Sequence, residues 1–185
     1  MFAAVLAVSD LGGGKYGDDE IIGANEKASL YQWYQSKSIK QAVVEQQGDL
    51  LQSLLDAGLI APQGTAPLQE RIAAGAADSA RYDKEKKEIL EGSAAVGPEG
   101  QVLEQNGVKG QIVGTKVWEA TLATLGAAGD LFDMSTLWLQ MGLVLGAVSL
   151  VMHAPGLKRG FYGAMVLSGV VGAVYTVRAF MVAMG

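Results

Sequence analysis

The pattern of hydrophobic positions separates a polar-rich stretch from a strongly apolar C-terminal end. Residues 134–152 contain no Asp, Glu, Lys, Arg or His. A helix over them, at about 1.5 Å per residue, is roughly 28 Å long and so matches the roughly 30 Å hydrocarbon core of a bilayer. A second apolar run, 161–184, follows the helix-breaking residues 155–156 and carries one charge, Arg178. The pattern predicts a transmembrane helical hairpin over residues 134–185.

A buried hairpin in the core of a soluble protein is the alternative interpretation of these two runs. Helices of soluble domains normally keep one face in water and show it as a polar stripe. Uninterrupted apolar runs of this length are rare in such domains. We therefore favour the membrane hairpin.

Upstream of residue 134 the pattern is helical and interrupted by loops rich in glycine and proline. Helices are predicted at residues 20–57, 68–91 and 101–133, with loops at 58–67 and 92–100. Mixed charges over residues 83–88 have the helical spacing typical of a solvated face. Gly107, Gly110 and Gly114 lie three and four apart, which indicates close approach to a neighbouring helix. With no β-strand pattern, the predicted fold class is all-α, with a helical, coiled-coil-like soluble body.

The N-terminal end is predicted as a short membrane anchor. Residues 1–8 are apolar but too few to cross a bilayer as a helix, so they are either the end of an anchor or a half-inserted segment. The triple glycine at 12–14 suggests a flexible exit, after which Asp18 and Asp19 can cap the next helix. The predicted domains are an anchor with a glycine hinge at 1–14, an acidic extramembrane body at 15–133, and the hairpin at 134–185.

The charges follow the same division. All 19 carboxylates lie before residue 134, against 11 of the 14 lysines and arginines, which gives that part a formal charge of −8. Phosphate binding needs a basic face, so the acidic body argues against nucleic acid as a partner. The hairpin contains only cations: Lys158, Arg159 and Arg178. By the positive-inside rule, the first two place the turn in the cytoplasm and the acidic body on the outer side.

Residue types that usually carry chemistry are scarce. The chain has no cysteine, which excludes disulfides, thiol catalysis and thiolate metal sites. Its one histidine, His153, stands in the turn beside Pro155 and cannot form a conventional zinc site alone. Asp78, Asp83 and Glu85 lack the Glu-x-x-His spacing of metal-binding bundles. We predict no catalytic residue, no cofactor and no metal site, and hence no enzyme.

Small side chains recur at helical spacing in both apolar runs. In lipid, faces of this kind allow close helix–helix packing, whether the partner helix belongs to the same chain or to another. The residues predicted to pack in this way are Gly142 and Gly146 in the first run, and Gly160, Ala164, Ser168, Gly172 and Thr176 in the second.

An aromatic and cationic cluster, consisting of Tyr31, Trp33, Tyr34, Lys37 and Lys40, marks the first long predicted helix. One interpretation is a surface for a partner or for lipid headgroups, where Trp and Tyr are enriched. The other is a helix–helix seam that uses the aromatic rings as core. We favour the seam.

Residues 12–41 resemble an uncharacterised bacterial membrane-protein family catalogued as a domain of unknown function, number forty-three thirty-seven. The matching features are the glycine-rich exit, the aromatic cluster and above all the string YQSKSIKQ at 34–41. The resemblance implies a membrane-anchored helical protein and supplies no activity. It places the protein in the bacterial inner membrane, with the body on the periplasmic side by the charge rule above.

These features together predict a non-enzymatic structural or accessory integral membrane protein. Its partners would be the lipid bilayer and either further copies of itself, as a homo-oligomer, or a larger membrane complex. The alternative is a pore-forming or transport-associated oligomer, which needs polar residues on one face of a membrane helix. Ser135, Thr136, Gln140 and Ser149 partly meet that requirement in the first apolar run.

Overall fold

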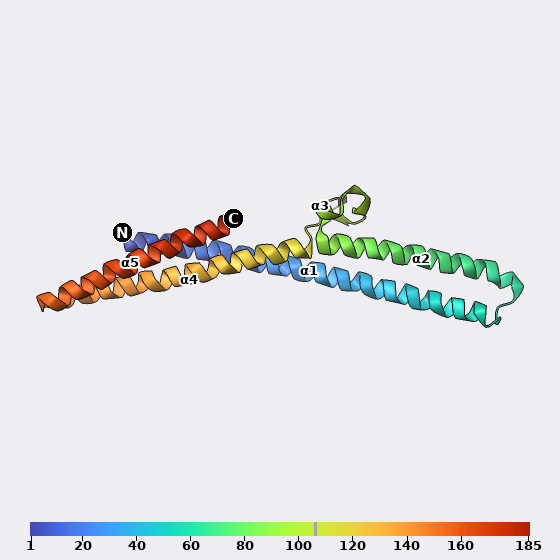
Figure 1. Ribbon diagram of the computed structural model, residues 1–185, viewed down its shortest axis with the longest axis horizontal. Coiled ribbons are helices and arrows are strands. Elements are labelled where there is room, and N and C mark those ends of the chain that lie inside the picture. Colours follow the sequence, from blue (N-terminus) through green and yellow to red (C-terminus); the bar gives the residue numbers. More distant parts are fainter. Residues whose placement is uncertain (106) are drawn as a thin grey trace. The chain divides into compact units, whose positions relative to one another are not determined.

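The computed structural model describes residues 1–105 and 107–185, and Figure 1 labels its helices α1 to α5. Almost all of it is helical, and the predicted all-α fold class is confirmed. The elements in chain order are α1 (Phe2–Asp56), α2 (Pro62–Glu91), α3 (Ser93–Val96), the 3-10 turn η1 (Pro98–Gly100), β1 (Glu104–Gln105), β2 (Val108–Lys109), α4 (Thr115–Val151) and α5 (Pro155–Met184).

The C-terminal hairpin forms as predicted. Among the described residues, two helices, α4 and α5, are long and apolar enough to cross a membrane. They meet at residues 152–154, where Ala154 is extended and Pro155 starts α5. Proline suits a first helical turn because its missing N–H would have no partner there.

Helix α1 begins far earlier than predicted. It runs unbroken from Phe2, so the hinge at residues 12–14 and the cap at Asp18 and Asp19 were wrong. Packing supplies the reason: a Cβ on Gly12 would lie 2.7 Å from the ring of Phe132 and 2.9 Å from that of Phe180. This glycine makes room for two aromatic rings, and their contact offsets its low helix propensity.

Residues 101–105 and 107–114 are not helical, which corrects the predicted start of the third helix. They contain an antiparallel strand pair in which Glu104 faces Lys109 and Gln105 faces Val108. Gly107 and Gly110 have positive φ angles of 78° and 82°, a region that glycine enters without strain, so they serve turns rather than helix packing. Gly114 closely approaches the backbone of Glu91 and Gly92, whereas Gly110 lies beside the side chain of Gln101.

The chain forms two compact units. Residues 1–24 and 120–185 make the first, called here the hairpin unit, and residues 25–119 make the second, called the body unit. Both α1 and α4 supply residues to each unit. The body unit includes fewer residues than the predicted body at 15–133, because residues 15–24 and 120–133 belong to the hairpin unit.

Each unit has a small apolar core. In the body unit, Ile89, Leu103 and Ile112 are buried and contact Leu30 and Trp33 of α1, among others. In the hairpin unit, the buried residues are Ala128, Phe132 and Ala179, with Tyr16 and Phe180 packed against them.

Candidate functional site

Within the hairpin unit, α4 and α5 pack most closely at two glycines, Gly142 and Gly172. A Cβ on Gly172 would lie 2.6 Å from Cγ and 3.1 Å from the backbone nitrogen of Leu139. At Gly142 the corresponding position lies 3.4 Å from the carbonyl oxygen of Met165 and from the nitrogen of Gly169. The small residues at these points are what allows the close approach.

Buried hydroxyl groups add directional contacts to this interface. The Ser135 hydroxyl donates to the carbonyl oxygen of Gly172 at 2.9 Å and lies 2.6 Å from the hydroxyl of Thr176. The Thr176 hydroxyl also donates to the Gly172 carbonyl at 3.1 Å. Because these hydroxyls are bonded between α4 and α5, they need no water, which suits an apolar environment.

The predicted small-residue ladder divides into two parts. Ser168, Gly172 and Thr176 are buried against α4, so this part packs within the chain. Gly146 also faces α5, where a Cβ would lie 2.7 Å from Sδ of Met165. Gly160 and Ala164 are exposed, and no heavy atom of the described residues lies within 4 Å of the position of a Gly160 Cβ.

The first turns of α1 lie along the hairpin. The Phe2 ring occupies the space beside Gly169, and the ring of Tyr16 stacks on Phe132 at 5.8 Å between centroids. Phe132 in turn meets Phe180 edge to face at 5.0 Å. Three helices therefore share one aromatic cluster.

The polar residues invoked for a pore do not form one open face. Ser135 is bonded to α5, and the hydroxyl of Ser149 donates back to the Gly146 carbonyl of its own helix at 2.8 Å. Thr136 donates to Oδ1 of Asp10 on α1 at 3.2 Å. Gln140 is the one of the four whose side chain is exposed.

The outer surface of the hairpin unit is apolar. Only 22% of the most apolar stretch of α4 and 28% of that of α5 are buried. Large side chains point outward along both helices, among them Leu137, Val144, Leu150, Val174, Val177 and Met181. Soluble monomers rarely expose contiguous apolar surface of this extent.

In the body unit, α1 and α2 are joined by a polar seam. Nζ of Lys37 lies 2.6 Å from Oε2 of Glu85, and both side chains are largely buried, at 16% and 9% exposed. The same ammonium lies 5.9 Å from the ring centre of Trp33 and 5.8 Å from that of Tyr82, close enough for cation–π attraction.

One turn further along α1, the amide of Gln41 continues this seam. It donates to Ser79 and to Asp83 of α2, each at 3.1 Å, and to Glu45 at 2.9 Å. The hydrogen bond from Ser79, followed by that from Gln41, holds the pKa of Glu45 below its usual range. The pKa of Asp83 is lowered by Lys86 and then by Gln41.

The predicted aromatic and cationic cluster divides between these contacts. Trp33 and Tyr34 pack on the body core, and Lys37 lies in the seam. The Tyr31 hydroxyl donates to Oε1 of Glu119 on α4 at 3.0 Å, while Lys40 is exposed. The geometry of three of the five residues is that of a helix–helix seam.

Oε1 of Glu119 also forms a salt bridge with Nζ of Lys27 at 3.0 Å. The hydrogen bonds from Lys27 and from Tyr31, in that order, lower the pKa of Glu119.

Glu88 is the residue that sequence reasoning missed. Its side chain is fully buried, so the predicted solvated face at residues 83–88 is wrong at Glu85 and Glu88, although Asp83, Lys84 and Lys87 are exposed. Oε1 accepts from the Ser93 hydroxyl at 2.7 Å, and Oε2 accepts from the backbone N–H groups of Val102 and Leu103, each at 2.8 Å. Glu88 thereby holds Ser93, Val102 and Leu103 in place after the end of α2.

In the part of the chain that the structure describes, no three His, Asp or Glu side chains gather closely enough to hold a metal ion. The contacts described above are helix interfaces and exposed helix surfaces.

Comparison with known proteins adds a family. The family model described as "Domain of unknown function (DUF4337)" matches residues 1–182. The chain belongs to the DUF4337 family. The resemblance inferred from the string at residues 34–41 is thus confirmed, and the match to DUF4337 covers nearly the whole chain. No curated protein and no solved structure matches it.

Proposed function

We propose that this DUF4337 protein is a non-enzymatic structural or accessory integral membrane protein. The hairpin unit would anchor it in the bilayer, and the body unit would stand outside. The observation that carries the proposal is the outward-facing apolar surface of α4 and α5, of which about three quarters of the most apolar stretches are unburied. Lipid is the solvent that makes such a surface favourable.

The interior of the hairpin unit supports the same proposal. Its helices pack through glycines and through hydroxyls that are already hydrogen-bonded, and many of its large apolar side chains face outward, although Phe132 and Leu139 are buried. Soluble bundles have the reverse arrangement, with large apolar residues inside. Helices that pack in lipid gain little from burying apolar surface and rely on close contact instead.

The beginning of α1 would share the bilayer with the hairpin. Phe2 lies beside Gly169, near the middle of α5, and Asp10 meets Thr136 close to the start of the predicted span. Residues 2–9 would therefore lie in the hydrocarbon region, and Asp10 would lie near its edge. Lys158 and Arg159 at the turn would face the cytoplasm, with the body on the periplasmic side of a bacterial inner membrane.

Assembly with further copies or with a larger membrane complex would use surface that is free within one chain. Gly160 and Ala164 continue the ladder beyond its contacts with α4, and small exposed residues of this kind allow a second helix to approach. The proposal needs no catalytic group.

The test is the mass of the native particle after gentle solubilisation, with identification of every chain in it. A fixed multiple of this chain would support a homo-oligomer, and a particle containing defined further proteins would support an accessory subunit. A monomer under conditions that preserve other membrane complexes would contradict assembly. Ala164→Leu should disrupt the particle, whereas Val166→Leu, at an exposed position on the opposite face of α5, should not.

A further inference from the structure

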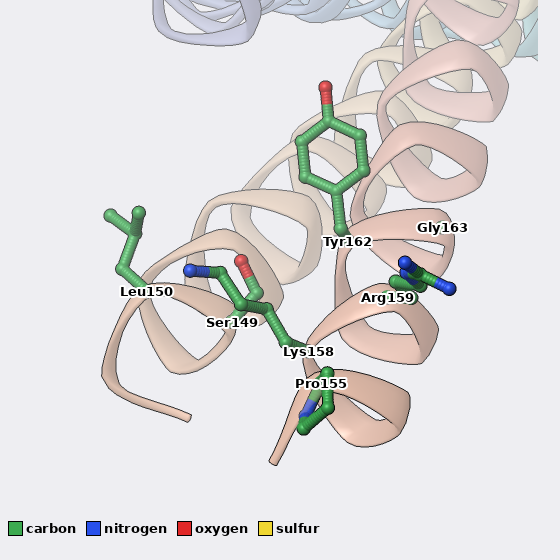
Figure 2. A pocket seen from close by; sticks show the side chains of 7 residues that line it. All are labelled: Ser149, Leu150, Pro155, Lys158, Arg159, Tyr162 and Gly163. Atoms are coloured by element: carbon green, nitrogen blue, oxygen red, sulfur yellow. The ribbon is translucent and has the colours of Figure 1, made fainter. Parts of the chain in front are cut away.

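A groove opens at the turn of the hairpin. Its volume is about 560 Å³, and its walls come from the last turns of α4 and the first turns of α5. Figure 2 shows Lys158 and Arg159 leaving α5 in different directions, with Pro155 on the side of the turn and the hydroxyl of Tyr162 pointing away from it.

Within the described residues, the two cations of the groove are not paired with a carboxylate. Across residues 1–105 and 107–185, neither Lys158 nor Arg159 forms a salt bridge. The sequence contains no Asp or Glu after Asp133. The groove therefore presents positive charge that an anion from outside the chain can neutralise.

The rest of the groove is apolar. Leu150, Pro155 and the ring of Tyr162 line it, and Leu150 is 78% exposed. An arginine offers paired N–H donors to phosphate oxygens, and a lysine adds a point charge. Cations beside an exposed hydrocarbon wall match a molecule with a phosphate at one end and an acyl chain at the other.

We propose that this groove binds an anionic phospholipid, with its phosphate at the cationic rim that Lys158 and Arg159 give the groove and an acyl chain against Leu150 and Tyr162. The inference rests on the proposed membrane location, which places the turn at the level of the headgroups. Free phosphate shares the charge chemistry but would leave the apolar wall without a partner.

The experiment uses the full chain reconstituted in nanodiscs of phosphatidylcholine containing a minor fraction of phosphatidylglycerol. Native mass spectrometry of the released protein counts the retained lipids of each kind, and a parallel titration uses inorganic phosphate. The expected result is preferential retention of phosphatidylglycerol and no saturable binding of phosphate. Lys158→Gln with Arg159→Gln should weaken that preference roughly tenfold, since each cation near a surface contributes attraction to anionic lipid.

Two substitutions that leave the charge of the protein unchanged distinguish lipid binding in the groove from attraction by diffuse surface charge. Gly163 lines the groove and Gly129 of α4 does not, and at neither does a Cβ meet a heavy atom of the described residues within 4 Å. Gly163→Leu should fill the groove and abolish the preference, whereas Gly129→Leu should leave it unchanged. If both retain the wild-type preference, or if phosphate binds as tightly as the lipid, the inference is overturned.

Reconstitution itself reports on the proposed function. If the wild-type chain fails to enter nanodiscs and stays soluble without detergent, the membrane location is wrong. If it enters but shows no lipid preference, only the groove proposal is wrong.

Discussion

The hairpin unit and the body unit use opposite kinds of residue to hold helices together. In the hairpin unit, α4 and α5 meet at Gly142 and Gly172 and share the hydroxyl of Ser135. In the body unit, α1 and α2 meet through the ion pair of Lys37 with Glu85 and the amide of Gln41.

The outer surfaces of the two units show the reverse difference, apolar in the hairpin unit and charged in the body unit. The hairpin unit exposes Val144, Leu150 and many similar side chains, whereas charged residues cover much of the body unit. Both α1 and α4 contribute residues to each unit. The kind of residue through which each of these helices packs therefore changes along its length. The difference teaches that the surroundings of each segment, rather than its helical form, decide which residues hold it in place.

The largest expected effect is at Glu88. Glu88→Ala removes an acceptor from two backbone N–H groups and the Ser93 hydroxyl, all buried or partly buried. We expect a loss of about 3 kcal/mol in the body unit, because buried donors without acceptors are costly. Hydrogen exchange at the amides of Val102 and Leu103 should accelerate strongly.

Glu99→Ala is the matched control, since Glu99 is exposed in the same segment. Protection of residues in the hairpin unit should stay unchanged in both variants. An equal response of the two units to Glu88→Ala would remove the distinction between them.

A second expected effect tests the hairpin unit. Gly172→Ala places a methyl group 2.6 Å from Cγ of Leu139, so the two helices must move apart. We expect a loss of about 2 kcal/mol, in the range of overpacked cores, measured as a lower midpoint of thermal unfolding in detergent.

Gly160→Ala is the control for Gly172→Ala, because its new methyl group meets no described heavy atom within 4 Å. It should be neutral or raise the midpoint slightly, as alanine favours helix more than glycine does. Equal destabilisation by both substitutions would show that close contact at Gly172 has no special importance.

The polar seam gives a smaller effect. Lys37→Met leaves Glu85 largely buried, with Nε of Arg81 at 3.6 Å as its remaining cationic contact. We expect a loss of about 1–2 kcal/mol, which Glu85→Met should partly reverse because the unpaired charge is then removed. A double variant less stable than the sum of the single changes would argue against an ion pair at this position.

The smallest effect is the response of the body unit to acid. Glu45, Asp83 and Glu119 have pKa values held below their usual range by hydrogen bonds and nearby lysines. A lowered folded-state pKa gives stability that is present above the unfolded value, near 4, and is lost as the pH falls through the folded value.

Circular dichroism of the chain in detergent from pH 6 down to pH 2 measures this loss. Glu119→Gln should reduce stability slightly at pH 6 and flatten the acid limb, since the contacts with Lys27 and Tyr31 then no longer depend on titration. A variant with the wild-type slope would exclude Glu119 as a source of the acid response.

The sequence predicted the hairpin well because its signals are local. An apolar run and a proline that can only begin a new helix need no knowledge of distant residues, and the small-residue spacing identified Gly142 and Gly172, which lie at the contact. The family resemblance at residues 34–41 was also local, and part of that string, Lys37 and Gln41, forms the seam with α2.

What the sequence did not predict depends on contacts between distant residues. The sequence alone suggests a hinge at Gly12, and only the structure shows that Phe132 and Phe180 pack beside it. Glu88 reads as one more surface charge, because its partners are backbone amides 14 and 15 residues away. The buried positions of α1 include Ser9, Gly12, Gly23 and Gln41, so hydropathy does not reveal its packed face.

The most direct test of the central claim is the labelling of single cysteines with a membrane-impermeant maleimide, which the cysteine-free chain permits without background. Val144 is 63% exposed, and Ala57, also exposed, directly follows the end of α1 in the body unit. In sealed membranes with reagent on both sides, Ala57→Cys should react at once, whereas Val144→Cys should react only after detergent is added. Equal labelling of the two cysteines without detergent would show that the apolar face meets water, and the membrane account would be wrong.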